Sequence, residues 1–207
     1  MRGANADCST PCSVPASGPR HLTVRIDESD GEKDASPFLY LRSRDAYHRM
    51  MLHVALVEPE IPPNTGNVAR LCAATNTELH IVGVTGFRMD DRTLRRSGLD
   101  YWRYVRFYRH LDLDELYRSL PTSRFIYFST KATKLYTDWK FQENDCLIFG
   151  PETRGLPNEV LNANRDHCLT IPMSNPNVRS LNLSTSVGIA VYEAVRQFTR
   201  TNEQPHE

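Results

Sequence analysis

The sequence predicts an α/β fold, with a mainly parallel sheet and flanking helices. From residue 52 onward, short apolar runs typical of buried strands alternate with longer segments whose apolar residues recur at helical spacing. Glycine or proline closes several of these runs. Strands that alternate with helices are joined by crossovers, which bring successive strands into the sheet in the same direction. We find no internal repeat.

The first predicted strand is residues 52–57, an apolar run closed by nearby prolines. Val68, Leu71 and Cys72 share one face of a predicted helix over 64–75. Further strands are predicted over 79–84, 104–108, 124–129, 146–149 and 168–171, and further helices over 111–120, 156–163 and 183–199, with a short one that begins at Asp90.

Composition fits one globular domain and excludes several classes of protein. The 207 residues are 40% hydrophobic, enough to bury a core. Lys and Arg together number 25, as do Asp and Glu, so the overall charge attracts no polyanion. No apolar run approaches the roughly 20 residues of a membrane span. The five cysteines form no C-x-x-C pair, which favours reduced thiols in a cytoplasmic protein without a metal site.

The first fifty residues differ from the rest. Small polar residues and prolines fill positions 5–20, and a strongly charged run follows at 27–34. Such a segment buries too little apolar surface to offset its ordering entropy, so we expect residues 1–50 to be a disordered extension. Its acidic residues argue against an organelle transit peptide. We expect the folded domain to cover 51–207, and hypothesise that Met51 is the native start.

Three polar segments follow predicted strands, at the edge where parallel sheets bind ligands. Residues 64–70 place backbone N–H groups at a helix N-terminus, a natural seat for phosphate, with Arg70 further along. Residues 149–156 carry two glycines beside Glu152 and Arg154. In 171–186, Ser, Asn and Thr crowd the start of the last helix, more than one cap requires.

The first two segments also have simpler interpretations. One is an ordinary Asn cap beside a surface arginine, and the other is a tight turn with a surface ion pair. The sequence contains no G-x-G-x-x-G after the first strand and no G-x-x-x-x-G-K-[ST]. The residues alone therefore predict an α/β protein with a three-loop site, and leave its chemistry open.

An arginine-rich stretch lies between residues 88 and 109. It holds seven arginines against three aspartates, interleaved with aromatic residues. Arginine binds phosphate, and aromatic faces stack on the bases of single-stranded loops, so the stretch favours RNA binding. The alternative is a solvated arginine face over core aromatics.

Four segments together resemble the motifs of SPOUT-class RNA 2'-O-methyltransferases. The resemblance is especially close to the TrmL/YibK type, the tRNA (cytidine/uridine-34-2'-O)-methyltransferases, and spans residues 52 to about 197. The segments are 58–67 (EPEIPPNTGN), 94–101 (LRRSGLDY), 149–157 (FGPETRGLP) and 180–184 (SLNLS).

The resemblance implies a C-terminal deep trefoil knot, one of the few exceptions to unknotted topology. It implies a homodimer whose site is completed across the interface, with S-adenosylmethionine as co-substrate and no metal. The expected substrate is the anticodon stem-loop of tRNA, methylated on the ribose of nucleotide 34, a cytidine or a carboxymethylaminomethyluridine.

The resemblance also implies roles for residues. Arg70 matches an arginine near the reacting ribose; because a guanidinium stays protonated, we expect it to position phosphate and stabilise charge rather than act as a base. The other polar positions around the substrate are Asn64, Glu152, Ser180 and Asn182. The expected cofactor residues are Phe128, Thr130, Gly150, Ile171, Ser180 and Leu181. The expected RNA-binding or dimer-face residues are Arg88, Arg92, Arg95, Arg96, Arg154 and Tyr192.

Two other functions stay open. One is a related 2'-O-methyltransferase that acts on another tRNA position or on rRNA. The other is a non-catalytic RNA-binding protein on the same fold. Intact Arg70, Glu152, Ser180 and Asn182 argue against the second, and cofactor titration separates it from an enzyme.

Overall fold

The computed structural model describes residues 51–87 and 101–201, which belong to one unit of the chain. Several predictions lie outside these residues. They are the extension over 1–50, the short helix that begins at Asp90, and the roles of Arg88, Arg92, Arg95 and Arg96.

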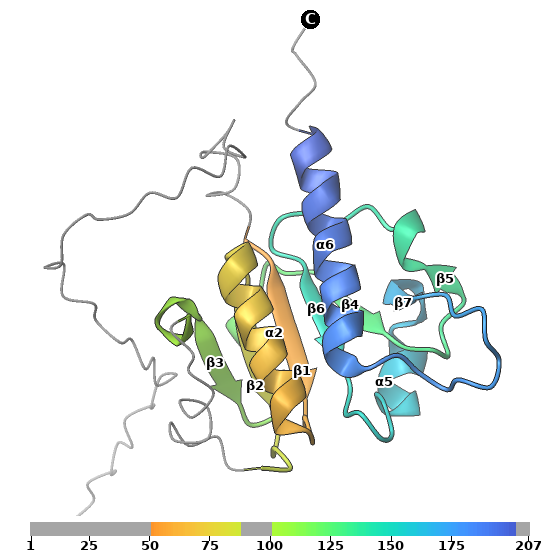
Figure 1. The fold of residues 1–207 in the computed structure, drawn as a ribbon, viewed down its shortest axis with the longest axis horizontal. Coiled ribbons are helices and arrows are strands. Elements are labelled where there is room, and N and C mark those ends of the chain that lie inside the picture. Colours follow the sequence, from red (N-terminus) through yellow and green to blue (C-terminus); the bar gives the residue numbers. More distant parts are fainter. Residues whose placement is uncertain (1–50, 88–100, 202–207) are drawn as a thin grey trace, which may run out of the picture. The chain divides into compact units, whose positions relative to one another are not determined.

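The centre of the described unit is a seven-stranded sheet in the order β3-β2-β1-β6-β4-β7-β5, in which every described strand pair is parallel (Figure 1). The predicted parallel α/β fold is therefore confirmed. The strands are β1 (His53–Val57), β2 (Glu78–Val82), β3 (Phe107–His110), β4 (Phe125–Phe128), β5 (Lys134–Leu135), β6 (Cys146–Phe149) and β7 (Cys168–Thr170).

Helices flank both faces of the sheet. They are α2 (Pro62–Thr75), α4 (Leu113–Ser119), α5 (Asn158–Ala163) and α6 (Leu183–Thr201), with short 3₁₀ turns at Trp102–Tyr104, Tyr136–Asp138 and Arg165–His167. Helices α2 and α6 lie side by side across one face (Figure 1). No helix among the described residues is long and apolar enough to cross a membrane.

Alternate residues of the central strands β1, β6 and β4 enter two apolar clusters, one on each face of the sheet. Val54 of β1 packs in a cluster with Val68 of α2 and Val187 of α6. Its neighbour Ala55 belongs to the other cluster, which includes Leu116 of α4. This double burial explains why the strands are continuous apolar runs in the sequence rather than alternating ones.

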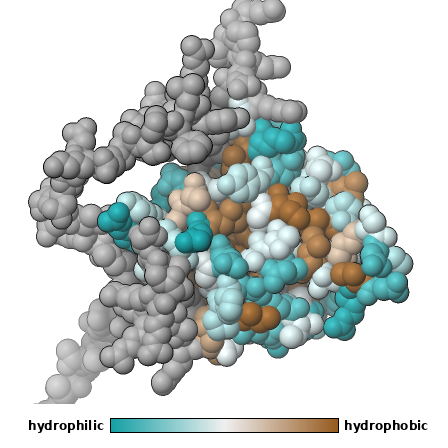
Figure 2. All heavy atoms as spheres, in the orientation of Figure 1, coloured by the Kyte–Doolittle hydropathy of each residue, from teal (hydrophilic) through white to brown (hydrophobic). Residues whose placement is uncertain are grey.

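The face that carries α2 and α6 mixes apolar with polar residues at its surface (Figure 2). Tyr192 of α6 is 56% exposed. A large aromatic side chain in this position is available for contact with another molecule.

Most predicted elements agree with the structure to within two residues at each end. Helix α2 begins at Pro62 rather than at 64, because proline lacks only an N–H that the first helical turn leaves unpaired. Strand β3 begins at Phe107 rather than at 104, since Trp102–Tyr104 forms a 3₁₀ turn. Strand β5, at the edge of the sheet, was not predicted.

Candidate functional site

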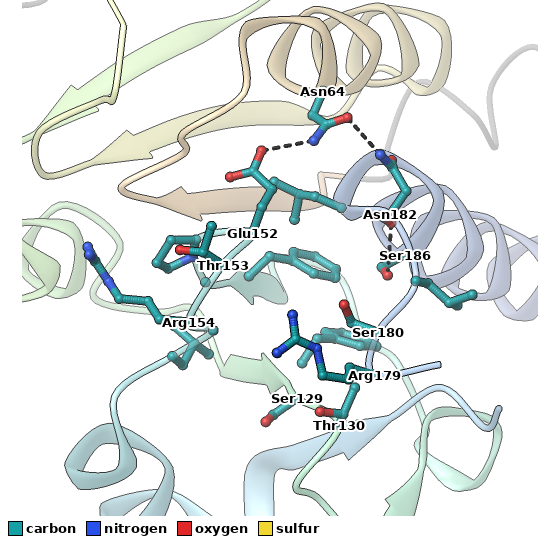
Figure 3. Close-up of a pocket in the computed structure, with 18 of the residues that line it drawn as sticks. Asn64, Ser129, Thr130, Glu152, Thr153, Arg154, Arg179, Ser180, Asn182 and Ser186 are labelled. Carbon is teal, nitrogen blue, oxygen red and sulfur yellow. Dashed lines mark hydrogen bonds between the residues drawn. The ribbon is translucent and has the colours of Figure 1, made fainter. Parts of the chain in front are cut away.

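A cavity of about 550 Å³ lies beyond the carboxyl ends of β4, β6 and β7 (Figure 3). All three predicted loop segments contribute to its wall, and the loop after β4 adds a fourth. The lining residues are Ile61, Asn64, Phe128, Ser129, Thr130, Lys131, Phe149, Gly150, Pro151, Glu152, Thr153, Arg154, Gly155, Leu156, Ile171, Arg179, Ser180, Leu181, Asn182, Leu183 and Ser186.

The wall after β6 is a tight turn that only glycine permits. A Cβ built at Gly150 would lie 2.4 Å from the backbone of Gly155 and Leu156. Gly155 has φ +67°, and its N–H donates to the carbonyl of Pro151 at 2.9 Å. The turn therefore presents backbone to the cavity at close range, and a side chain at Gly150 would force it open.

A chain of side-chain hydrogen bonds joins the three segments (Figure 3). The amide of Asn64 donates to Glu152 Oε1 at 3.0 Å, and Asn182 donates to Asn64 Oδ1 at 2.9 Å. Asn64 is only 5% exposed. Because both functional ends of its amide are engaged, the Asn64 side chain has a fixed orientation at the edge of the cavity.

Glu152 lies at one end of this row of hydrogen bonds, and it also binds backbone N–H groups just before the N-terminus of α2. Its Oε2 accepts from the backbone N–H of Glu60 at 2.8 Å, and its Oε1 accepts from that of Ile61 at 3.3 Å. A carboxylate in this position faces the positive end of the helix. Glu152 thus serves as an anchor for two backbone N–H groups and the Asn64 amide.

Asn182 has two functions. Its Oδ1 accepts from the backbone N–H of Ser184 at 2.9 Å and of Thr185 at 3.3 Å, which is the geometry of a helix N-cap for α6. Its amide nitrogen bonds Asn64. Two of the roles filled by the small polar residues before α6 are therefore its N-cap and the hydrogen bond from Asn182 to Asn64.

A second set of contacts joins the loops after β1 and β6. Thr153 donates from its backbone and its hydroxyl to Glu60, at 3.0 and 2.9 Å. Arg154 forms an exposed ion pair with Glu58 and points away from the cavity (Figure 3). Within its own chain, the Arg154 side chain therefore fits the simpler interpretation given above, that of a surface ion pair.

Arg70 does not line the cavity. It is exposed on α2, where its guanidinium stacks over the Tyr101 ring at 4.8 Å. The Tyr101 hydroxyl donates to the carbonyl of Gly66 at 3.1 Å, which fixes the ring beneath the arginine. The structure therefore separates Arg70 from the other four predicted polar positions, which all line the cavity.

The six predicted cofactor residues all line the cavity. Phe128 stacks on Phe149 with ring centroids 4.7 Å apart, which gives the cavity an apolar inner wall. Sequence reasoning missed Arg179, whose guanidinium points into the cavity (Figure 3). The signal for it was its position directly before the Ser180-Leu181-Asn182 motif.

The described cysteines are free and buried. Burial raises the pKa of the Cys72 thiol to about 12 and also raises that of Cys146. A buried, protonated thiol is a poor nucleophile. None of these three described cysteines lines the cavity.

Residues 51–192 match the SpoU rRNA Methylase family. The chain belongs to this family. A curated relative, tRNA (cytidine(34)-2'-O)-methyltransferase from Escherichia coli (strain K12), is 47% identical over 149 residues, which cover 72% of this chain and 94% of the relative.

Solved structures agree with this assignment. One, described as giving structural insights into the 2'-OH methylation of C/U34 on tRNA, is 46% identical with a TM-score of 0.69, and the match covers 73% of this chain and 99% of that one. The SpoU methyltransferase AviRb from Streptomyces viridochromogenes, solved with AdoMet, is 23% identical with a TM-score of 0.65 over 73% of this chain and 62% of that one, which shows a shared fold.

Proposed function

We propose that this chain transfers a methyl group from S-adenosylmethionine to the ribose 2'-hydroxyl of the wobble nucleotide, position 34, of tRNA. The observation that carries the proposal is that the three polar loop segments line one shared cavity, with Asn64, Glu152 and Asn182 hydrogen-bonded in a row at its edge. The activity named for relatives at 46–47% identity supports the choice of substrate.

The residues present fit an S-adenosylmethionine molecule. The cavity, of about 550 Å³, lies within the range typical of sites for small molecules. Its inner wall is aromatic and apolar at Phe128, Phe149 and Ile171, which suits an adenine ring. Gly150 leaves the backbone bare where the ligand approaches. The bound cofactor supplies an electrophilic methyl group on a sulfonium centre.

The row of polar side chains acts mainly by positioning. Glu152 accepts three hydrogen bonds and Asn64 uses both ends of its amide, so neither needs to reorganise when the substrate binds. A fixed polar edge orients the ribose for in-line approach of its 2'-oxygen, which is the largest contribution available to this reaction. Ser180 and Arg179 line the same cavity. Arg179 offers a cation for an anionic group of either ligand.

We further propose that the active unit is a homodimer. Arg70 lies outside the cavity of its own chain, and Arg154 points away from it. In the proposed dimer, both would act at the cavity of the second copy. The exposed Tyr192 of α6 provides aromatic surface for that contact.

Two finer features are part of the same proposal. The chain passes from β7, beside β4, back to α6 beside α2, and Asn182 bonds Asn64 on the way. This return path supports a deep trefoil knot. The arginines of the stretch 88–109 would bind the phosphates of the anticodon stem-loop, in a protein that works in the cytoplasm.

The test is methylation of total tRNA with isotope-labelled S-adenosylmethionine, followed by nuclease digestion and mass spectrometry. We expect label on the ribose of nucleotide 34. Label at another tRNA position would replace this substrate with a related one. Cofactor binding without any transfer would favour a non-catalytic RNA-binding protein.

A further inference from the structure

A second cluster of polar side chains lies within the sheet, away from the cavity. His53 is the first residue of β1, and Glu78 is the first residue of β2, its register partner. His80 follows two residues later, on the same face of β2. The two histidines are each 2% exposed and Glu78 is 9% exposed. The cavity, in contrast, lies beyond the carboxyl ends of β4, β6 and β7.

Three donor atoms of this cluster converge on one point. His53 Nδ1 lies 3.2 Å from Glu78 Oε2 and 3.1 Å from His80 Nε2, and the third side of the triangle is 4.0 Å. Tetrahedral Zn²⁺ with bonds of about 2.0–2.1 Å keeps its ligand atoms roughly 3.3–3.4 Å apart. The triangle therefore accepts such an ion after shifts of well under an ångström.

Two of the three potential ligands, His80 and Glu78, have an outer partner. His80 Nδ1 lies 2.9 Å from His110 Nε2. The other oxygen of Glu78 lies 3.5 Å from the Tyr108 hydroxyl. Histidines that bind metals usually donate their second ring N–H to such a partner, which fixes the tautomer and turns the free lone pair toward the ion.

The contacts are poorly accounted for by hydrogen bonds alone. If His80 donates to His110, its Nε2 carries only a lone pair, and so does Glu78 Oε2. The single proton of His53 Nδ1 must then serve two acceptors, at 3.1 and 3.2 Å. A cation between the three atoms satisfies all of them together.

We propose that His53, Glu78 and His80 form a binding site for a Zn²⁺-type divalent transition-metal ion, with its fourth position open to water. Two imidazoles and one carboxylate suit such an ion, whereas Mg²⁺ and Ca²⁺ require oxygen ligands. The ion would join β1 to β2 and, through His110, β2 to β3. Its effect is therefore on the stability of this half of the sheet, and the proposal does not depend on methyl transfer.

Arg106 lies beside the proposed site, with its Nε 3.6 Å from Glu78 Oε1. The Glu78 side chain is 12% exposed and that of Arg106 is 39% exposed. The guanidinium repels a divalent cation bound to the Glu78 carboxylate. Arg106→Gln should therefore tighten metal binding by several-fold, which a cluster held only by hydrogen bonds does not predict.

The test uses the full chain, stripped with a chelator and desalted. Zn²⁺ is titrated in competition with a chromogenic chelator, and Co²⁺ binding is followed by visible absorbance, whose intensity separates four-coordinate from six-coordinate sites. We expect one equivalent bound with the intense Co²⁺ spectrum. At about 100-fold excess over the dissociation constant, Zn²⁺ should raise the melting temperature by roughly 5–10 °C.

Variants assign the site. Glu78→Gln and His80→Gln should each weaken binding at least about tenfold, as should His110→Gln through the outer partner. His167→Gln, which removes an exposed histidine outside the cluster, should bind as the parent does. Circular dichroism checks that each variant is folded.

Three outcomes would overturn the proposal. They are no binding by the parent chain, a weak six-coordinate Co²⁺ spectrum, or binding that survives in folded Glu78→Gln and His80→Gln. The last would place the ion on other donors, such as Cys8 and Cys12. Even if a variant fails to fold, absent binding or a six-coordinate Co²⁺ spectrum in the parent overturns the proposal.

Discussion

The side chain of Asn182 donates a hydrogen bond to the side chain of Asn64 across 118 residues of sequence, at 2.9 Å. This contact joins the N-cap of α6 to the first turn of α2, and Glu152 completes the row from the turn after β6. The polar edge of the cavity is therefore one connected structure, so a change at its central residue should disturb all of it.

Asn64→Ala should lower kcat/KM for tRNA methylation by roughly 100-fold, because it removes both bonds that orient the row. The dissociation constant for S-adenosylmethionine should change far less, since the apolar wall stays intact. Steady-state kinetics and calorimetry measure the two quantities. Asn162→Ala, on the exposed side of α5, is the matched control. An equal loss of kcat/KM in Asn64→Ala and Asn162→Ala would show that Asn64 has no specific role in positioning the substrate.

Gly150→Ala should abolish detectable cofactor binding and lower the free energy of unfolding by about 1–3 kcal/mol, because its Cβ would lie 2.4 Å from backbone atoms. Gly155→Ala is the contrast. Nothing lies within 4 Å of its Cβ, and only the positive φ opposes it, at a cost of about 1–2 kcal/mol. Chemical denaturation and calorimetry compare the two. A Gly150→Ala variant that binds normally would contradict this geometry.

Arg70→Gln should lose methylation activity yet retain S-adenosylmethionine binding, because Arg70 lies outside its own cavity. If it serves the partner's cavity, a mixture with the Gly150→Ala variant should recover activity. Subunits reassorted at random give about a quarter of the parental activity, since half the dimers carry one intact site. Activity assays on co-refolded mixtures check this, and a complete lack of recovery would show that Arg70 acts within its own chain.

Acid should destabilise the sheet through His80. Burial, and then His53 and His110, lower the pKa of His80 from 6.5 to about 2. In the unfolded chain His80 therefore binds a proton near pH 6.5, whereas in the folded chain it stays neutral until the pH is far lower. The stability that this group contributes is complete above pH 6.5 and is lost as the pH falls toward 2. This one group contributes a slope of up to about 1.4 kcal/mol per pH unit.

The measurement is urea denaturation between pH 7 and pH 4, with a chelator present so that no metal contributes. The parent chain should lose more stability on acidification than folded His80→Gln does. Parallel curves for the two proteins would show that His80 does not titrate in this way.

Arg95→Glu combined with Arg96→Glu should weaken tRNA binding at least about tenfold and reduce its dependence on salt, because lost phosphate contacts release fewer counterions. Cofactor binding should be unchanged. Filter binding at several salt concentrations tests this. Retained tRNA affinity at moderate salt would place the RNA footprint elsewhere.

The sequence predicted the sheet and the cavity wall well, for a physical reason. Buried parallel strands are continuous apolar runs, and the loops at their carboxyl ends carry Asn64, Glu152 and Asn182 within short motifs. Strand β5 was not predicted because a strand of two exposed residues at the sheet edge leaves no hydrophobic pattern in the sequence.

Side-chain direction could not be predicted in the same way. The motifs contain Arg70 and Arg154, yet neither guanidinium points into the cavity, whereas Arg179 does (Figure 3). The pairing of His53 with Glu78 depends on the register of two parallel strands, which spacing along the chain does not encode. Tertiary geometry decides both.

The most direct test of the proposed reaction compares two synthetic anticodon stem-loops that differ only in the sugar of nucleotide 34. One carries ribose there and the other 2'-deoxyribose, and transfer of labelled methyl from S-adenosylmethionine is counted for each. We expect about one methyl per ribose stem-loop and none on the 2'-deoxy stem-loop. Equal labelling of both would contradict transfer to the 2'-hydroxyl of nucleotide 34.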